Sequence, residues 1–155
     1  MNYWDKKVIR DQLDKKLISL KEFSSSKMPS QGWIRVIREA CGLSAKQLGK
    51  KVGLGQSRIS RLENAEKDGS LKLSSLQKIA KGLNMQFVYG FVPIDKGSLE
   101  QIVTKQARQL ALKRLKRLND TMLLEKQGLS ETEQKKALED MVQKILVEQP
   151  KEIWD

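Results

Sequence analysis

Histidine is absent from this chain of 155 residues, and cysteine occurs once, at Cys41. Without histidine the chain lacks the side chain that most often serves as general base and metal ligand near neutral pH. A lone thiol excludes an internal disulfide, which fits a reducing compartment, and it leaves too few ligands for a transition-metal site. The sequence also shows no nucleophile–base pair and no glycine-rich phosphate loop. We therefore expect no catalytic site, no metal and no cofactor, and predict that the protein is not an enzyme.

Long apolar runs are missing as well. No run approaches the roughly 20 residues that a helix needs to cross a bilayer. The N-terminal stretch MNYWDKKVIRDQL is charged and amphipathic, and it lacks the apolar block of a signal peptide. We expect a cytoplasmic protein that makes no membrane contact.

Basic residues are abundant and unevenly placed. The chain has 30 Lys and Arg against 19 Asp and Glu, a net charge of +11. Residues 1–117 hold 25 basic and 10 acidic side chains, whereas residues 118–155 hold 5 and 9. A basic body favours a polyanionic partner, because each cation near a phosphate releases a condensed counterion. Composition alone does not separate this interpretation from a basic protein without a specific ligand.

Apolar spacing predicts a chain made mainly of helices. Residues 5–23 form an amphipathic helix, and the polar stretch SSSKMPS at 24–30 is a linker. Four short helices follow between 31 and 83, with expected N-caps at Ser30, at Ser44 and at Ser74 or Ser75. A long helix covers 98–127. A capping box of Ser130 and Glu133 then begins a last helix that runs to about Gln149.

One segment has a different period. MQFVYGFVP, residues 85–93, is aromatic and β-branched, ends at a proline and is predicted as a short strand over 85–92. A single strand cannot satisfy its own backbone. It must pair with its twin in a second copy, which would make the protein a homodimer, or with residues of its own chain such as Met1–Trp4.

The stretch LSAKQLGKKVGLGQSRISRLEN, residues 43–64, predicts a helix-turn-helix. Two short helices carry inward apolar residues, and Gly53 takes the turn between them. Such a motif places its second helix in the major groove of DNA, N-terminus first. Gln can pair with adenine and Arg can fork onto guanine, whereas serines, backbone N–H groups and lysines suit phosphates. The predicted phosphate contacts are Ser44, Lys46, Lys50, Lys51 and Arg58.

Residues 32–83 resemble the phage-repressor-like (XRE-type) helix-turn-helix family. The family's base-contacting positions fall on Gln56, Ser57, Ser60 and Arg61, so the resemblance implies that these four residues contact bases. Its charge-paired helix positions fall on Arg38 and Glu63. Two positions depart from the pattern. Ala45 stands where the family often has a phosphate-binding glutamine, and Gly55 stands where it often has a Ser or Thr cap.

A narrower resemblance covers nearly the whole chain. QGWIRVIREACGLS, FVYGFVP, SLEQIVTKQAR, NDTMLLE and the terminal IWD together resemble mobile mystery protein A. Its members are antitoxin-like regulators whose genes adjoin one for a Fic-domain protein, so the resemblance implies that kind of partner. Fic inhibitory helices have the form Ser/Thr-x-x-x-Glu-Gly/Asn; Thr121 and Glu125 fit it, and Lys126 at the sixth position does not.

The resulting prediction is an all-α fold: an XRE-type helix-turn-helix bundle with N- and C-terminal helical extensions and one short dimerising β-strand. Its segments are 1–30 (helix and linker), 31–84 (DNA-binding domain), 85–97 (strand and turn) and 98–155 (helical extension). The predicted function is a sequence-specific transcription regulator that represses its own promoter through a palindromic operator in double-stranded DNA and is the antitoxin of a toxin–antitoxin-like pair. The alternative is a protein-binding antitoxin that mainly inhibits a Fic-domain toxin through its helical tail. The basic run KQARQLALKRLKR, 105–117, either contacts DNA or pairs with acidic residues of the last helix.

Overall fold

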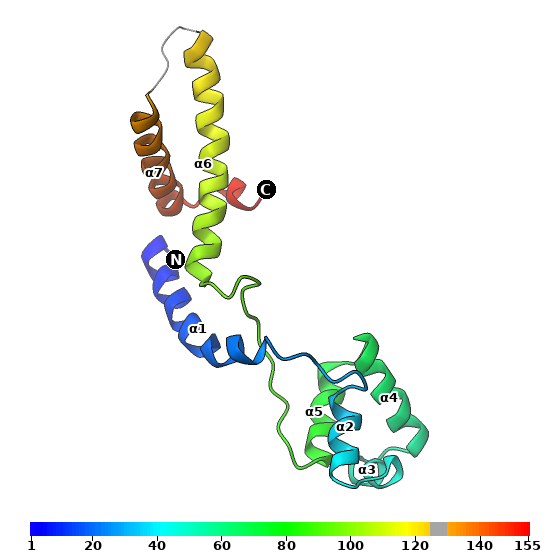
Figure 1. Ribbon diagram of the computed structural model, residues 1–155. Coiled ribbons are helices and arrows are strands. Elements are labelled where there is room, and N and C mark those ends of the chain that lie inside the picture. Colours follow the sequence, from blue (N-terminus) through cyan, green and yellow to red (C-terminus); the bar gives the residue numbers. More distant parts are fainter. Residues whose placement is uncertain (125–129) are drawn as a thin grey trace. The chain divides into compact units, whose positions relative to one another are not determined.

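The computed structural model describes residues 1–124 and 130–155, which divide into two compact units (Figure 1). One unit combines residues 1–22 with 91–155, and the other is 23–90. Over the described residues the chain is helical and contains no strand. The elements are α1 (Tyr3–Phe23), α2 (Trp33–Ala40), α3 (Ala45–Val52), α4 (Gln56–Asp68), α5 (Leu73–Gly82), α6 (Leu99–Leu124), α7 (Glu131–Glu148) and the 3₁₀ helix η1 (Lys151–Trp154).

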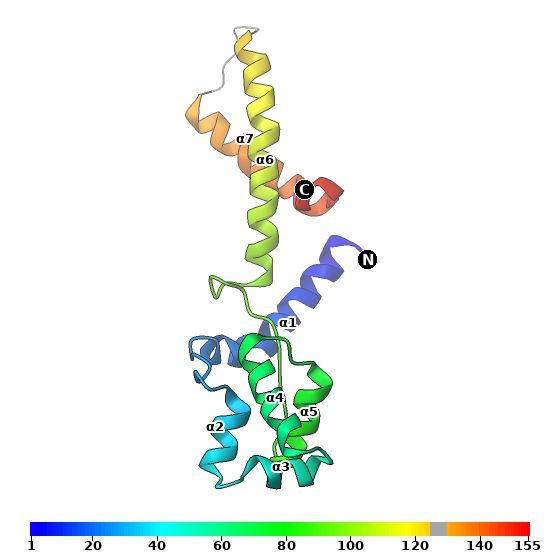
Figure 2. The ribbon, with the colours of Figure 1, turned by 90° about the vertical axis from the view of Figure 1, so that its right-hand side faces the viewer.

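In the first unit, α6 and α7 pack against each other. The two helices lie beside each other in Figure 1, and in Figure 2 α7 crosses α6 at an angle. Fully buried Ala107 and Ala111 of α6 meet Val142 and Ile145 of α7. Because alanine is small, the two helix backbones can approach closely at this level. Ser130 and Glu133 form the predicted capping box at the start of α7.

Helix α1 is fastened to the first turn of α6 by polar contacts. The carboxylate of Asp14 accepts the Leu99 N–H at 3.1 Å, so α1 supplies an anion to the N-terminus of α6. Arg10 forms an ion pair with Glu100 at 2.7 Å, and the hydroxyl of buried Tyr3 donates to the same carboxylate. The N-terminal helix therefore belongs to the same unit as the C-terminal helices.

The second unit is built from the four short helices. Its core consists of Ile34, Leu48, Val52, Ile59, Leu62 and Ile79. The predicted cap of α3 is present, since the Ser44 hydroxyl accepts the Gln47 N–H while the Gln47 side chain accepts the Ser44 N–H. The caps predicted for α2 and α5 were wrong. Gly32 and Lys72 stand at those positions, and neither offers a side-chain cap bond.

The N-terminus of α2 is capped by the carboxylate of Glu66, which is distant in sequence. The two oxygens of Glu66, on α4, accept the N–H groups of Trp33 and Ile34, each at 3.0 Å. Gly32 leaves room for this contact, because a Cβ there would lie 2.7 Å from a Glu66 oxygen, and its φ of +83° also favours glycine. An anion at a helix N-terminus satisfies otherwise unpaired donors.

A buried ion pair joins the same two helices. Arg38 donates from Nε to Glu63 at 2.6 Å and from Nη2 to its other oxygen at 3.3 Å, while Nη1 donates to the Leu43 carbonyl at 2.8 Å. Both side chains are buried. The hydrogen bond to Glu63 raises the pKa of the Arg38 guanidinium, although its burial acts in the opposite direction.

The turn between α3 and α4 depends on two glycines. Gly53 ends α3 with φ of +71°, in the left-handed region. Gly49 is buried within α3, and a Cβ there would lie 2.3 Å from the backbone oxygen of Leu54. The Leu54 N–H donates to the Gly49 carbonyl at 2.8 Å, so the chain after the turn lies directly against α3.

The strand predicted over 85–92 is not formed. These residues are not helical and have no ladder partner among the described residues. Tyr3 and Trp4 belong to α1, so the N-terminal residues do not supply a second strand. The physical reason is that an aromatic, β-branched sequence favours a strand only where another strand completes its hydrogen bonds.

We expect Glu63→Ala to lower the free energy of unfolding of this unit by about 3–5 kcal/mol, because Arg38 would keep a buried charge without its partner. Urea unfolding followed by hydrogen exchange of residues 33–82 measures the loss. Arg35→Ala is the matched control, since it breaks the exposed Arg35–Glu39 pair, and it should cost under about 1 kcal/mol. Equal losses from the two substitutions would contradict the role of burial.

We expect Gly49→Ala to destabilise the same unit by about 1–3 kcal/mol, because the Leu54 carbonyl must move and overpacking exceeds the gain in helix propensity. The control is Gly55→Ala, whose Cβ meets nothing within 4 Å and whose φ of −75° is ordinary. That control should lose under about 1 kcal/mol. Thermal unfolding followed by circular dichroism compares the two variants. A Gly49→Ala variant as stable as the wild-type protein would contradict the close approach of the Leu54 carbonyl to α3.

Candidate nucleic-acid interface

Helix α4 has two faces of opposite character. Ile59 and Leu62 are buried in the core, and Glu63 and Glu66 contact α2. With 3.6 residues per turn, Ser57, Ser60 and Arg61 point away from the core, and Gln56, in the first turn, lies at the edge of the same exposed face. All four are exposed. The packing of α4 therefore presents these side chains together on one side of the helix.

These polar side chains have few partners within the protein. Ser60 donates its hydroxyl to the Gln56 carbonyl at 3.2 Å. In the part of the chain that the structure describes, the side chains of Gln56, Ser57 and Arg61 make no hydrogen bond or ion pair. An exposed face of donors and acceptors without internal partners is chemically suited to the edges of bases.

The N-terminus of α4 is open. Gly55 offers no side chain to cap it, so the first N–H groups of the helix keep no partner from a cap. The positive end of the helix dipole lies at the same place, and together these features suit a phosphate oxygen. The departure from the family pattern at Gly55 thus removes an internal competitor for these donors.

The predicted phosphate contacts fall into two groups. Lys46 and Lys50 are exposed and four residues apart, so they share a side of α3. Ser44 is exposed, and its hydroxyl oxygen already accepts the Gln47 N–H at 3.1 Å. It can still donate its own proton to an anion.

Lys51 and Arg58 lie beside α5 instead. Lys51 lines a shallow hollow with Lys78 and Lys81, and Arg58 lines a small one that also includes Lys78. Lys78 and Lys81 are not among the phosphate contacts predicted from the sequence, because nothing in their local pattern distinguishes them from other surface lysines. Only the packing of α5 against α3 and α4 brings these four cations together.

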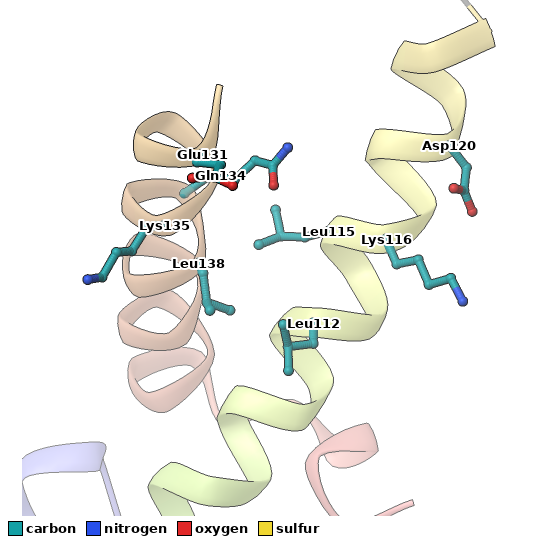
Figure 3. A pocket seen from close by; sticks show the side chains of 9 residues that line it. Leu112, Leu115, Lys116, Asp120, Glu131, Gln134, Lys135 and Leu138 are labelled. Atoms are coloured by element: carbon teal, nitrogen blue, oxygen red, sulfur yellow. The ribbon is translucent and has the colours of Figure 1, made fainter. Parts of the chain in front are cut away.

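The basic run on α6 is partly neutralised within its own unit. Arg108 forms an ion pair with Glu139 of α7 at 2.9 Å, and Arg114 forms one with Glu152 of η1 at 3.3 Å. A groove of about 500 Å³ lies between α6 and α7. In Figure 3, Leu115 and Leu138 point into it, and the end of the Lys116 side chain points away from α7. Pairing with acidic residues therefore accounts for part of the run.

The candidate Fic-inhibitory residues are only partly described. Thr121 is exposed on α6 and donates its hydroxyl to the Arg117 carbonyl at 3.0 Å. Glu125 lies outside the described residues. Among the described residues, no cluster of acidic or cysteine side chains could hold a metal ion, and no helix is both long and apolar enough to span a membrane.

Comparison with known proteins supports the assignment of the motif. Residues 34–89, about a third of the chain, match the family model HTH_3, described as Helix-turn-helix, which covers XRE-type domains. No curated protein and no solved structure matches the chain. These comparisons give no support to the narrower resemblance to mobile mystery protein A, which stays a prediction. The family match and the exposed face of α4 agree: residues 34–89 form a helix-turn-helix domain of the kind found in DNA-binding transcription regulators.

Proposed function

We propose that this protein is a sequence-specific repressor that binds, as a homodimer, a palindromic operator near its own promoter. The observation that carries the proposal is the exposed face of α4, where the side chains of Gln56, Ser57 and Arg61 have no internal partner among the described residues. The match of residues 34–89 to a helix-turn-helix family supports it.

In the proposed complex, α4 enters the major groove with its N-terminus first. Gln56 lies in the first turn and offers both a donor and an acceptor, the pattern that adenine requires. Arg61 lies further along the same face and forks onto guanine O6 and N7. Ser57 and Ser60 are short and complete the contact near the helix axis.

Phosphate contacts position the domain without reading sequence. We assign them to the open N-terminus of α4, to Ser44, Lys46 and Lys50 on one side, and to Lys51 and Arg58 on the other. Lys78 and Lys81 join the second group, because they line the same hollows. A palindrome requires two copies of α4 about 34 Å apart, which is why the proposal includes a homodimer.

As a finer assignment, we propose that the repressor is the antitoxin of a toxin–antitoxin-like pair. The resemblance to mobile mystery protein A supports this, and it implies a Fic-domain protein as partner. The alternative, direct inhibition of such a protein through Thr121 and Glu125 of the C-terminal extension, rests on the same resemblance. Sequencing the neighbouring gene and co-expressing its product with the chain tests both.

We expect Arg61→Ala to weaken binding to the specific site by about 1–3 kcal/mol and to relax preference at one base pair, because a guanine fork is lost. The specific site is obtained by selecting duplexes from a random pool with the full-length chain. Lys50→Ala is the control and should weaken binding to selected and random DNA alike. If Arg61→Ala also weakens both equally, Arg61 contacts a phosphate instead.

We expect the double substitution Lys78→Ala/Lys81→Ala to flatten the salt dependence of binding to random duplex DNA. Each lost phosphate contact makes the negative slope of log K against log salt shallower by about 0.9. Titrations between roughly 50 and 200 mM salt measure it. Lys15→Ala/Lys16→Ala, exposed on α1, is the control. If the Lys78→Ala/Lys81→Ala variant has an unchanged slope, neither lysine contacts a phosphate.

A further inference from the structure

Residues 86–92 form a segment whose backbone is unpaired. Within residues 1–124 and 130–155, no backbone hydrogen bond involves these residues. The bonds nearest in sequence are the Met85 N–H to the Ala80 carbonyl, which ends the α5 region, and the Lys96 N–H to the Pro93 carbonyl. A row of free donors and acceptors on such a segment is a template for another strand.

The side chains of this segment are unusual for a surface. Val88, Tyr89 and Phe91 are 68%, 63% and 83% exposed. Aromatic and β-branched residues are the types that strands favour, because they pack against cross-strand neighbours. The backbone of the segment and the exposed side chains of Val88 and Phe91 therefore lack the partner that they are suited to.

We propose that the partner is the same segment of a second copy, paired antiparallel about a two-fold axis through Tyr89. The proposal names the interface of the homodimer and rests on the proposed function only for the requirement of two copies. A second copy carries the identical free edge, whereas Tyr3 and Trp4, the alternative within one chain, are held in α1. A two-fold interface is also the commonest symmetry of soluble oligomers.

The register through Tyr89 follows from the side chains. It sets Tyr89 against its own copy and sets Phe87 opposite the second copy's Phe91, so that all the aromatic rings share one face. Phe87 and Tyr89 already lie on a common side, since their rings stack with centroids 5.9 Å apart and planes 15° apart. On the other face, Val88 meets the second copy's Gly90, where no side chain intervenes.

The aromatic pairs favour the non-hydrogen-bonded positions of the ladder, because side chains are closer there. Val88 and Gly90 then exchange the backbone hydrogen bonds. Pro93 lies just beyond the pairing and cannot donate, so it ends the strand.

A two-stranded ribbon is only marginally stable alone and needs an apolar surface to pack on. The second unit provides one beside the segment. A groove of about 330 Å³ is lined by Phe87 and Val88 themselves together with Trp33, Ile37 and Leu83. Burying one face of the ribbon in this groove supplies the hydrophobic contribution that the hydrogen bonds do not.

A charge exchange tests the register on the full-length chain by sedimentation at micromolar concentration. Phe87→Lys and Phe91→Glu each place a charge opposite an aromatic ring of the second copy, and each should weaken dimerisation at least about tenfold. The double variant sets opposite charges across both Phe87–Phe91 pairs and should recover most of the dimer. Failure of the double variant to exceed both single variants overturns the register.

A cross-link tests the two-fold position. In a Cys41→Ser background, Tyr89→Cys should oxidise readily to a covalent dimer, because directly opposed strand residues have the Cα separation that a disulfide needs. Gln86→Cys, which the register places opposite Val92 rather than its own copy, should not. Cross-linking by Gln86→Cys and not by Tyr89→Cys overturns the proposal.

Val88→Pro tests the ladder itself, since proline removes a hydrogen bond from each of the two strands. It should weaken dimerisation at least about tenfold while circular dichroism shows the helices intact. Leu112→Lys, in the half-exposed α6–α7 groove, is the control and should leave the dimer unchanged. A folded, fully dimeric Val88→Pro, dimer loss only in Leu112→Lys, or a monomeric wild-type chain overturns the proposal. If the dimer forms with this register but selects no specific DNA sequence from a random pool, the dimer interface stands and only the proposed function is overturned.

Discussion

The buried pair of Arg38 and Glu63 determines which side of α4 is available to a ligand. The pair fastens α4 to α2, and Glu66, nearly one turn later, holds the N-terminus of α2 from the same side. Any rotation of α4 about its axis would separate these groups and leave a buried charge unpaired, at a cost of several kcal/mol. The face that carries Gln56 and Arg61 is therefore oriented by the interior of the domain before any ligand arrives.

The turn before α4 adds the second constraint. Gly53 supplies the left-handed residue, and Gly49 lets the Leu54 carbonyl lie against α3. With the position of α4 fixed by this turn and its rotation fixed by Arg38, the uncapped N-terminus at Gly55 is left open to solvent. Orientation and exposure of the candidate interface thus arise from contacts that involve none of its own side chains.

Local chemistry made much of this predictable. Ser44 and Ser130 each have the capping-box partner three residues later, and Gly53 follows an apolar helix period, so these helix ends could be predicted from a few neighbouring residues. The cap on α2 could not, because Glu66 reaches it only after α4 has packed. Lys78 and Lys81 could not be predicted as part of the interface either, because only the packing of α5 brings them near Lys51. The Arg38–Glu63 pair came from the family resemblance, since no spacing within one helix indicates it. The strand failed because β propensity describes a segment, whereas a strand requires a partner.

The energetics of base recognition indicate why the proposed repressor would use two copies of α4. Gln56 and Arg61 are the two side chains of the interface able to make bidentate base contacts, each worth about 1–3 kcal/mol of discrimination. One copy therefore supplies about 2–6 kcal/mol, whereas specific sites are typically preferred over random DNA by about 4–10 kcal/mol. Two copies held at a fixed spacing reach that range, and the phosphate-contacting lysines add affinity without adding discrimination. In the proposed repressor a second subunit therefore widens the discrimination that one reading face supplies, and residues 86–92, which we propose as the dimer interface, would join the two subunits.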